Sequence, residues 1–147
     1  VRFPGLISYK TPPGGGTTDY AVAIYFEAAR HQKYTCYLKA GTFLDMMYMP
    51  DALRAAVELM EAAPSKLNHR NAFNVSAMTV APETIAAEIK KLIPGFTLDY
   101  NIDPLRQAIA DSWPNSLDDG AAREEWGWQP EYDLESMSQD MIENIKK

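Results

Sequence analysis

The sequence predicts an α/β fold, and three features of the pattern carry that prediction. Strand-like and helix-like segments alternate along the 147 residues. The helix-like segments have apolar residues three and four positions apart, as at Ile85, Ala86 and Ile89. Prolines stand where helices are expected to begin, at Pro50 and Pro82, and a first helical position tolerates proline because its N–H needs no partner.

The expected strands are short. They cover residues 2–8, 34–38, 43–49, 71–76 and 96–100. Pro4 and Gly5 must bend or end the first of them, because proline cannot donate to a strand ladder. The Ala40-Gly41 turn separates the second from the third.

The expected helices fill most of the remaining chain. They cover about 17–32, 50–63, 82–93, 105–109, 116–126 and 133–145. In the second helix, Leu53, Ala56, Val57 and Met60 form one apolar face. A capping box over 116–119 is expected to begin the fifth helix, and Asp133 is expected to cap the last.

The composition fits one globular domain and excludes several partners. Hydrophobic residues make up 46% and charged residues 23%, which is ordinary for a soluble chain. A net charge of −6 without a basic stripe argues against nucleic acid. No apolar stretch approaches the ~20 residues of a membrane span. Cys36 is the only cysteine, so a reducing compartment and a buried thiol are expected rather than a disulfide.

Residues 14–20 form the most informative segment, because three glycines and two threonines precede a helical pattern. Glycine lets a backbone approach a ligand closely, and the first helical turn offers unpaired N–H groups to an anion. A small carboxylate or a phosphate would suit such a site. Helix capping alone explains one hydroxyl of Thr17 and Thr18, whereas substrate contact explains both.

Other polar residues have plainer interpretations. Asp45 and Asp51 flank a strand-to-helix junction, where they could order a loop or form an acid pair; the loop interpretation is favoured. His31 and His69 have no second histidine or cysteine at ligand spacing, so no metal site is expected.

Six segments, in order, resemble the extended short-chain dehydrogenase/reductase family, and within it the L-threonine 3-dehydrogenases related to sugar-nucleotide epimerases. The general family motifs are Arg2-Phe3-Pro4-Gly5, the segment 43–51, Phe73-Asn74-Val75-Ser76 and the segment 122–130. Those typical of threonine dehydrogenases are the segments 15–20 and 110–116. The resemblance covers essentially the whole chain.

Two family motifs are absent from the chain. Gly14 and Gly16 have Asp19 where a dinucleotide-binding loop needs its third glycine, and they do not follow a first strand. None of the eight tyrosines has a lysine four residues later, so the catalytic Tyr-x-x-x-Lys is missing. The resemblance therefore implies that residues 1–147 are a C-terminal, substrate-binding portion: the last strands and helices of a Rossmann-like sheet plus the small substrate domain, without the N-terminal dinucleotide-binding part.

For the intact enzyme, the resemblance implies oxidation of L-threonine to 2-amino-3-oxobutanoate with NAD. The resemblance places Pro4, Gly5, Leu6 and Ile7 beside the nicotinamide. Without the resemblance, the end of a strand with no ligand would explain these residues. Thr17, Thr18 and Trp113 become candidate substrate contacts, with core packing the alternative for Trp113. Arg2 could pair with the substrate carboxylate or lie in solvent. No catalytic residue is expected in this chain.

The resemblance also sets the expected partners and the competing functions. It implies a homodimer when intact, association with the missing N-terminal half, and a cytoplasmic location, or the mitochondrial matrix in a eukaryote. One alternative is half of a sugar-nucleotide epimerase or dehydratase, which would need basic residues for a diphosphate. The other is a non-catalytic interaction fragment.

Overall fold

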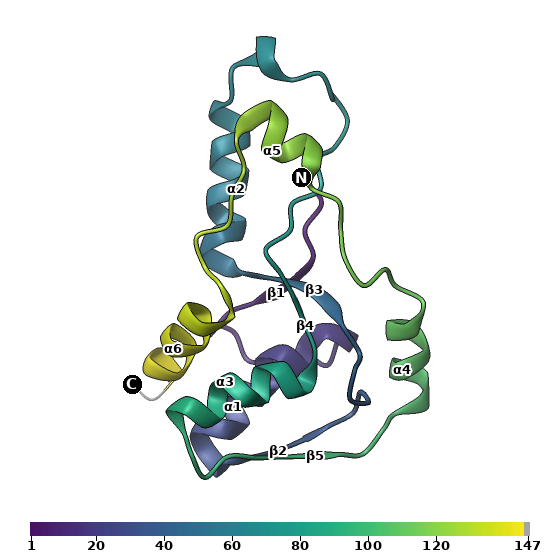
Figure 1. Ribbon diagram of the computed structural model, residues 1–147, viewed down its shortest axis with the longest axis vertical. Helices are drawn as coiled ribbons and strands as arrows, with labels where there is room; N and C mark the ends of the chain where they lie inside the picture. The colour runs from purple at the N-terminus through teal and green to yellow at the C-terminus, as the bar shows by residue number, and fades with distance from the viewer. Residues whose placement is uncertain (146–147) are drawn as a thin grey trace.

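A computed structural model describes residues 1–145 of the chain (Figure 1). The strands are β1 (Gly5–Ile7), β2 (Lys33–Cys36), β3 (Leu44–Tyr48), β4 (Met78–Val80) and β5 (Thr97–Tyr100). The helices are α1 (Tyr20–His31), α2 (Met49–Glu61), α3 (Pro82–Leu92), α4 (Pro104–Asp111), α5 (Gly120–Trp126) and α6 (Leu134–Ile145). Two 3-10 turns, η1 (Thr17–Asp19) and η2 (Pro64–Lys66), complete the described elements. The predicted α/β class is confirmed.

The strands form two separate small sheets. In the first, β3 lies between β1, which is parallel to it, and β4, which is antiparallel. In the second, β2 pairs with β5 in parallel. Helices α1, α3 and α6 pack on one another, and α1 covers β2 while α3 covers β5 (Figure 1).

The apolar side chains divide into two clusters. The larger joins α1, α3 and α6 to both sheets and includes Ile7, Tyr25 and Met141. The smaller lies under α2 and α5, where Trp128 is fully buried among Met47, Ala52, Ala55, Phe73, Val75 and Ala122. The second cluster fixes the segment after α5 against β3, and that strand also contributes to the wall of the candidate site.

Three expected boundaries are wrong, each for a local reason. Residues 71–76 make only one bridge, from Arg2 to Asn74, and the neighbouring strand is β4 instead. Residues 17–19 form the turn η1, so α1 begins at Tyr20. The expected capping box at 116–119 does not form: Asp118 accepts from the Gly120 N–H, and α5 begins at Gly120.

The cap expected at the last helix is confirmed. The Asp133 carboxylate accepts a 2.8 Å hydrogen bond from the Ser136 N–H, and the Ser136 hydroxyl donates to the same oxygen. These bonds satisfy donors at the start of α6 that no helical carbonyl can reach.

The apolar face expected on α2 exists but points away from the core. Leu53, Val57 and Met60 are 63%, 52% and 84% exposed. The buried positions of this helix are Asp51, Ala52 and Ala55. The fully buried positions of the helix thus carry a carboxylate and two alanines, and Met49 and Leu59 pack partly against the smaller cluster, whereas the expected apolar face turns outward.

Cys36 is expected to resist thiol reagents in the native chain. Its side chain is fully buried in the larger cluster, and burial raises the pKa of its thiol to about 11. At pH 8 both factors keep the reactive thiolate scarce. A colorimetric disulfide reagent should label no thiol in buffer and one thiol per chain in guanidinium chloride. Full labelling of the native chain within minutes would show that Cys36 is accessible.

Candidate functional site

A cavity of about 350 Å³ gathers four of the residues predicted to contact the cofactor or the substrate. They are Pro4 and Gly5 at the start of β1, Thr18 in η1, and Trp113 after α4. The other lining residues are Phe3, Leu44, Asp45, Pro114 and Leu117. Residues far apart in the sequence thus meet at one hollow, and most of its wall is apolar.

Gly5 brings η1 against the strand. A Cβ atom at this position would lie 2.3 Å from Met46 Sδ and 3.1 Å from Thr18 Cγ2, closer than side chains normally approach. Glycine is therefore needed here for close packing, not for an unusual backbone angle. The contact places Thr18 of η1 beside Gly5.

The two threonines of η1 have different roles. The Thr18 side chain lines the cavity, and within residues 1–145 its hydroxyl has no hydrogen-bond partner. Thr17 does not line the cavity, and its carbonyl accepts a hydrogen bond from the Tyr37 hydroxyl. The same hydroxyl donates to the Gly16 carbonyl at 2.8 Å. Thr18 is thus the threonine whose hydroxyl a ligand could use.

Tyr37 keeps its proton at neutral pH and so remains a donor to this turn. Burial, which outweighs the nearby Arg106 cation, raises the pKa of its hydroxyl to about 12. The Arg106 guanidinium lies over the Tyr37 ring, 4.3 Å from its centroid. This stacked pair supports the turn from the side of α4.

The glycine loop does not offer its N–H groups to an outside anion. The N–H groups of Gly14, Gly15 and Gly16 all donate to one carboxylate oxygen of Asp19, at 2.7, 2.7 and 2.9 Å. Such a nest of backbone donors is a normal anion site, and here the anion is internal. The expectation that these glycines bind a ligand carboxylate is therefore wrong: they lock the loop onto η1.

Asp45 holds the opposite wall of the cavity. Its buried carboxylate accepts hydrogen bonds from the Ser76 hydroxyl, the Thr79 hydroxyl and the Leu117 N–H, at 2.9, 2.9 and 2.6 Å. The last bond ties the 113–117 segment to β3. These contacts fit the loop-ordering interpretation of Asp45 and leave no support for an acid pair.

Trp113 forms an exposed wall. It is 41% exposed, and within residues 1–145 its indole N–H has no hydrogen-bond partner. Among the described residues, Trp113 is therefore not part of the buried core, the alternative weighed for it. An aromatic face beside apolar residues and a free hydroxyl is typical of small-ligand pockets.

Besides Thr17, three residues of the predicted set lie outside this cavity. Ile7 is fully buried in the larger cluster. Leu6 packs against the smaller cluster. Arg2 is exposed, and its backbone bonds to Phe73 and Val75. The roles assigned to Leu6, Ile7 and Arg2 remain predictions, and none of the three residues lines the cavity.

The charges around the cavity limit its ligands. None of its nine lining residues carries a positive charge, and its one carboxylate is held by three donors. Among residues 1–145 no group of three or more metal-ligating side chains occurs. In the same part of the chain no helix is both long and apolar enough to cross a membrane. A larger open hollow of about 920 Å³ lies near Glu58 and Trp126, but it contains no residue predicted for the site.

A tyrosine that acts as a general base needs a lowered pKa, and six of the eight tyrosines have the opposite shift. Burial raises the pKa of these six. They are Tyr20, Tyr25, Tyr34, Tyr37, Tyr48 and Tyr100. No tyrosine lines the cavity, and these six are unsuited to remove a proton.

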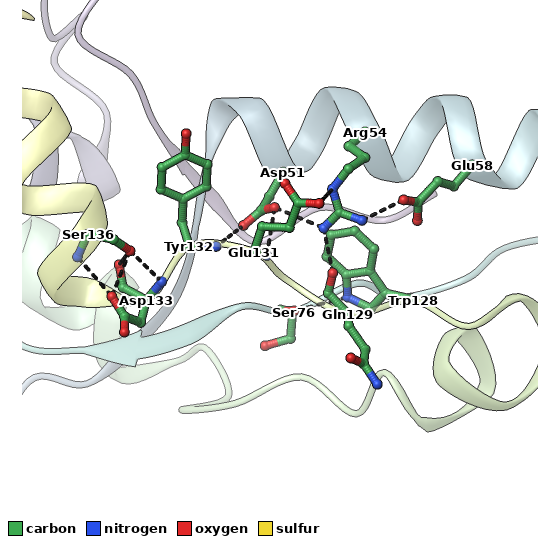
Figure 2. A network of polar contacts seen from close by, with 10 residues as sticks. All are labelled: Asp51, Arg54, Glu58, Ser76, Trp128, Gln129, Glu131, Tyr132, Asp133 and Ser136. Atoms are coloured by element: carbon green, nitrogen blue, oxygen red, sulfur yellow. Dashed lines mark hydrogen bonds and ion pairs between the residues drawn. The ribbon is translucent and has the colours of Figure 1, made fainter.

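The second carboxylate of the strand-to-helix junction builds the polar network shown in Figure 2. Asp51 is fully buried and accepts hydrogen bonds from the N–H groups of Glu131 and Tyr132, at 3.0 and 3.1 Å. It also pairs with the Arg54 guanidinium at 3.0 Å, and that guanidinium lies 4.9 Å from the centroid of the Trp128 ring. Asp51 thus orders the segment that leads into α6.

The chain is similar in sequence and structure to several known proteins. The chain is 57% identical over 147 residues to an uncharacterized epimerase/dehydratase of Staphylococcus haemolyticus, covering all of this chain and 46% of the relative. It superposes on the L-threonine dehydrogenase of Clostridium difficile with a TM-score of 0.96 at 60% identity, covering 99% of this chain and 46% of that one. For the GalE-like L-threonine dehydrogenase of Cupriavidus necator, in its holo form, the TM-score is 0.95 at 54% identity, with 99% and 47% covered. No protein-family model matches the chain.

In sequence and fold, the chain matches the C-terminal half of these L-threonine dehydrogenases. It spans about half the length of the relatives and of the solved threonine dehydrogenases that it matches. The resemblance found in the sequence motifs is therefore confirmed.

Sequence reasoning missed several parts of the site. It missed the apolar wall of Phe3, Leu44 and Leu117, because isolated apolar residues carry no signal of a shared surface. It also missed Asp19 as the partner of the glycines. The spacing could have shown it, since an aspartate three residues after a glycine loop is well placed to accept from that loop.

Proposed function

We propose that this chain forms the substrate side of an NAD-dependent L-threonine 3-dehydrogenase, with residues 1–147 as its C-terminal portion. The observation that carries the proposal is the cavity in which Pro4, Gly5, Thr18 and Trp113 meet. The likeness to solved threonine dehydrogenases supports the choice of substrate. When bound, NAD would accept the hydride from the threonine hydroxyl carbon.

The cavity suits a small zwitterion with a methyl group. Leu44, Pro114 and Leu117 provide apolar contact for the methyl, and the unpartnered Thr18 hydroxyl can hydrogen-bond a carboxylate. A nucleotide sugar would bring a diphosphate, and no cation lines the cavity to receive it. The amino-acid substrate is therefore favoured over the sugar-nucleotide alternative.

The cofactor would meet this chain at Pro4 and Gly5. Gly5 has no side chain, and both residues line the cavity, so a flat ring could approach the backbone there. The general base, its neighbouring lysine and the pyrophosphate loop would come from the N-terminal half. A homodimer of the intact enzyme and a cytoplasmic or matrix location remain predictions that follow from the resemblance.

The isolated chain is expected to show no dehydrogenase activity. It contains no Tyr-x-x-x-Lys pair and no complete glycine-rich pyrophosphate loop, so it lacks the groups for proton removal and cofactor binding. The measurement follows NADH absorbance with NAD and L-threonine. Steady turnover by the purified chain alone would contradict the prediction that this chain lacks the groups for proton removal and cofactor binding.

Joining the chain to the N-terminal segment of the Clostridium difficile enzyme tests the substrate assignment. The chimera is expected to oxidise L-threonine and to leave UDP-sugars unchanged. Epimerisation of a UDP-sugar without threonine oxidation would overturn the proposed function. Thermal stabilisation by threonine, by a nucleotide sugar or by neither gives an independent readout.

A further inference from the structure

Two parts of the cavity wall come from segments that are far apart in the sequence. Thr18 belongs to η1, whereas Trp113 and Pro114 follow α4. The structure brings η1 into contact with α4. A ligand that touches both Thr18 and Trp113 needs these segments at a fixed separation, because a misplacement of about 1 Å weakens the productive geometry.

Tyr37 contacts both segments at once. Its hydroxyl donates to the Gly16 carbonyl at 2.8 Å and also reaches the Thr17 carbonyl at 3.2 Å. Its backbone carbonyl accepts a 2.9 Å hydrogen bond from the N–H of Asp103, the N-cap residue of α4. The guanidinium of Arg106 in α4 lies 4.3 Å from the centroid of its ring. One residue thus joins η1 to α4 through its hydroxyl, its ring and its carbonyl.

The turn η1 is closed upon itself, so a contact at Gly16 also fixes the position of Thr18. One carboxylate oxygen of Asp19 accepts from the N–H groups of all three glycines at 14–16. The Gly16 carbonyl in turn accepts a 3.2 Å hydrogen bond from the Asp19 N–H. Thr18 lies within this closed turn, and the Tyr37 hydroxyl holds the turn from outside.

Helix α4 is fixed to the loop that follows β2. The Gln107 side chain accepts from the Lys39 N–H at 2.8 Å and donates to the Thr42 hydroxyl at 3.1 Å. The Lys39 ammonium also pairs with Asp111 at 3.1 Å. Asp111 is the last residue of α4, and Trp113 follows shortly after it. The loop therefore holds the end of the helix that carries the aromatic wall.

We infer that Tyr37 is a positioning residue for the substrate: it holds Thr18 at the separation from Trp113 that threonine requires. This inference rests on the proposed function and adds to it a residue that does not line the cavity. Tyr37 acts through Thr18, whose hydroxyl has no partner among residues 1–145 and is available to a ligand.

The loss of the Tyr37 hydroxyl should weaken substrate binding more than it slows the chemical step. Without this donor, part of the binding free energy of threonine must be used to order η1. The groups that remove the proton and accept the hydride are assigned to the N-terminal half and to NAD, so their arrangement does not depend on Tyr37. The expected result is a higher KM for threonine with a similar kcat.

The test uses the chimera with the N-terminal segment of the Clostridium difficile enzyme. Tyr37→Phe removes the hydroxyl and keeps the ring under Arg106. It should raise KM for threonine about fivefold, the loss expected from one neutral hydrogen bond, and leave kcat and KM for NAD within about twofold. Tyr25→Phe is the matched control, because its hydroxyl bonds to Ser138 at 2.6 Å in the larger cluster and does not line the cavity. The control should leave KM for threonine within about twofold.

A double variant shows whether Tyr37 acts through Thr18. When Thr18→Val has already removed the hydroxyl that Tyr37 positions, adding Tyr37→Phe should change KM for threonine by less than about twofold. A purely structural role of Tyr37 would instead add the same fivefold effect to either background.

Hydrogen exchange in the chain alone provides a readout that does not depend on activity. Mass spectrometry follows the amide hydrogens of the segment 14–19, whose glycine N–H groups are bound to Asp19. Tyr37→Phe should speed their exchange about tenfold, because the turn loses its outside support. Tyr25→Phe should leave the exchange of this segment unchanged.

In an active chimera, any of three results would overturn the inference: an unchanged KM for threonine in Tyr37→Phe, an equal rise of KM for NAD, or an additive effect with Thr18→Val. Unchanged exchange of the segment 14–19 in Tyr37→Phe would overturn it as well. A wild-type chimera that binds NAD but does not oxidise threonine would overturn the proposed function and with it the role of Tyr37 toward that substrate. Faster exchange in Tyr37→Phe would then still assign to Tyr37 the support of η1.

Discussion

Replacing Asp51 by alanine is expected to lower the free energy of unfolding by about 3 kcal/mol, because a buried carboxylate that serves several partners is lost. The N–H groups of Glu131 and Tyr132 would lose their acceptor, and Arg54 would lose one of its carboxylates. Arg54 would still pair with Glu58, which limits the loss. Urea unfolding of the chain, followed by far-UV circular dichroism, measures the change.

Two further variants separate the contributions to this network. Asp51→Asn keeps an oxygen acceptor of the same shape and should lose less than Asp51→Ala. Arg54→Met removes the cation but leaves both backbone hydrogen bonds of Asp51. Asp51→Ala, Arg54→Met and the corresponding double variant therefore form a double-mutant cycle, which measures the coupling between the two side chains. If alanine at position 51 changes the stability by less than about 0.5 kcal/mol, the size of an ordinary surface substitution, the network has no structural role.

Much of the fold could be predicted from the sequence where local signals are strong. The helices that begin at Pro50, Pro82 and Asp133 carry proline or capping signals at their starts, and the structure confirms them. The expected strand at 71–76 is wrong because its pairing depends on Arg2, which lies about 70 residues away in the chain. No local pattern reports such a partner.

The outward face of α2 shows a different limit of sequence reasoning. Periodicity identifies Leu53, Val57 and Met60 as one face, but it cannot say what covers that face. Burial of the opposite face is decided by Asp51, whose partners lie about 80 residues later. The same holds for the cavity, where spacing identified Thr18 and only the fold brought it to Gly5.

Thr18 is the residue on which the substrate assignment depends most. Thr18 lines the cavity, and its hydroxyl has no protein partner among residues 1–145, whereas Thr17 does not line the cavity. In the chimera with an N-terminal half, Thr18→Val keeps the side-chain shape and removes the hydroxyl. Losing a hydrogen bond to a charged carboxylate is expected to cost roughly 1–3 kcal/mol, a fall of about 5- to 150-fold in kcat/KM for threonine.

Thr17→Val is the matched control, since it makes the same chemical change one residue earlier. It should leave kcat/KM for threonine within about twofold of wild type, because side chains away from bound groups contribute little. The affinity for NAD should be unchanged in both variants, since Pro4 and Gly5 are the residues assigned to the cofactor. An equal loss in the two variants, or a loss of NAD affinity in Thr18→Val, would make η1 a structural support and move the substrate site elsewhere.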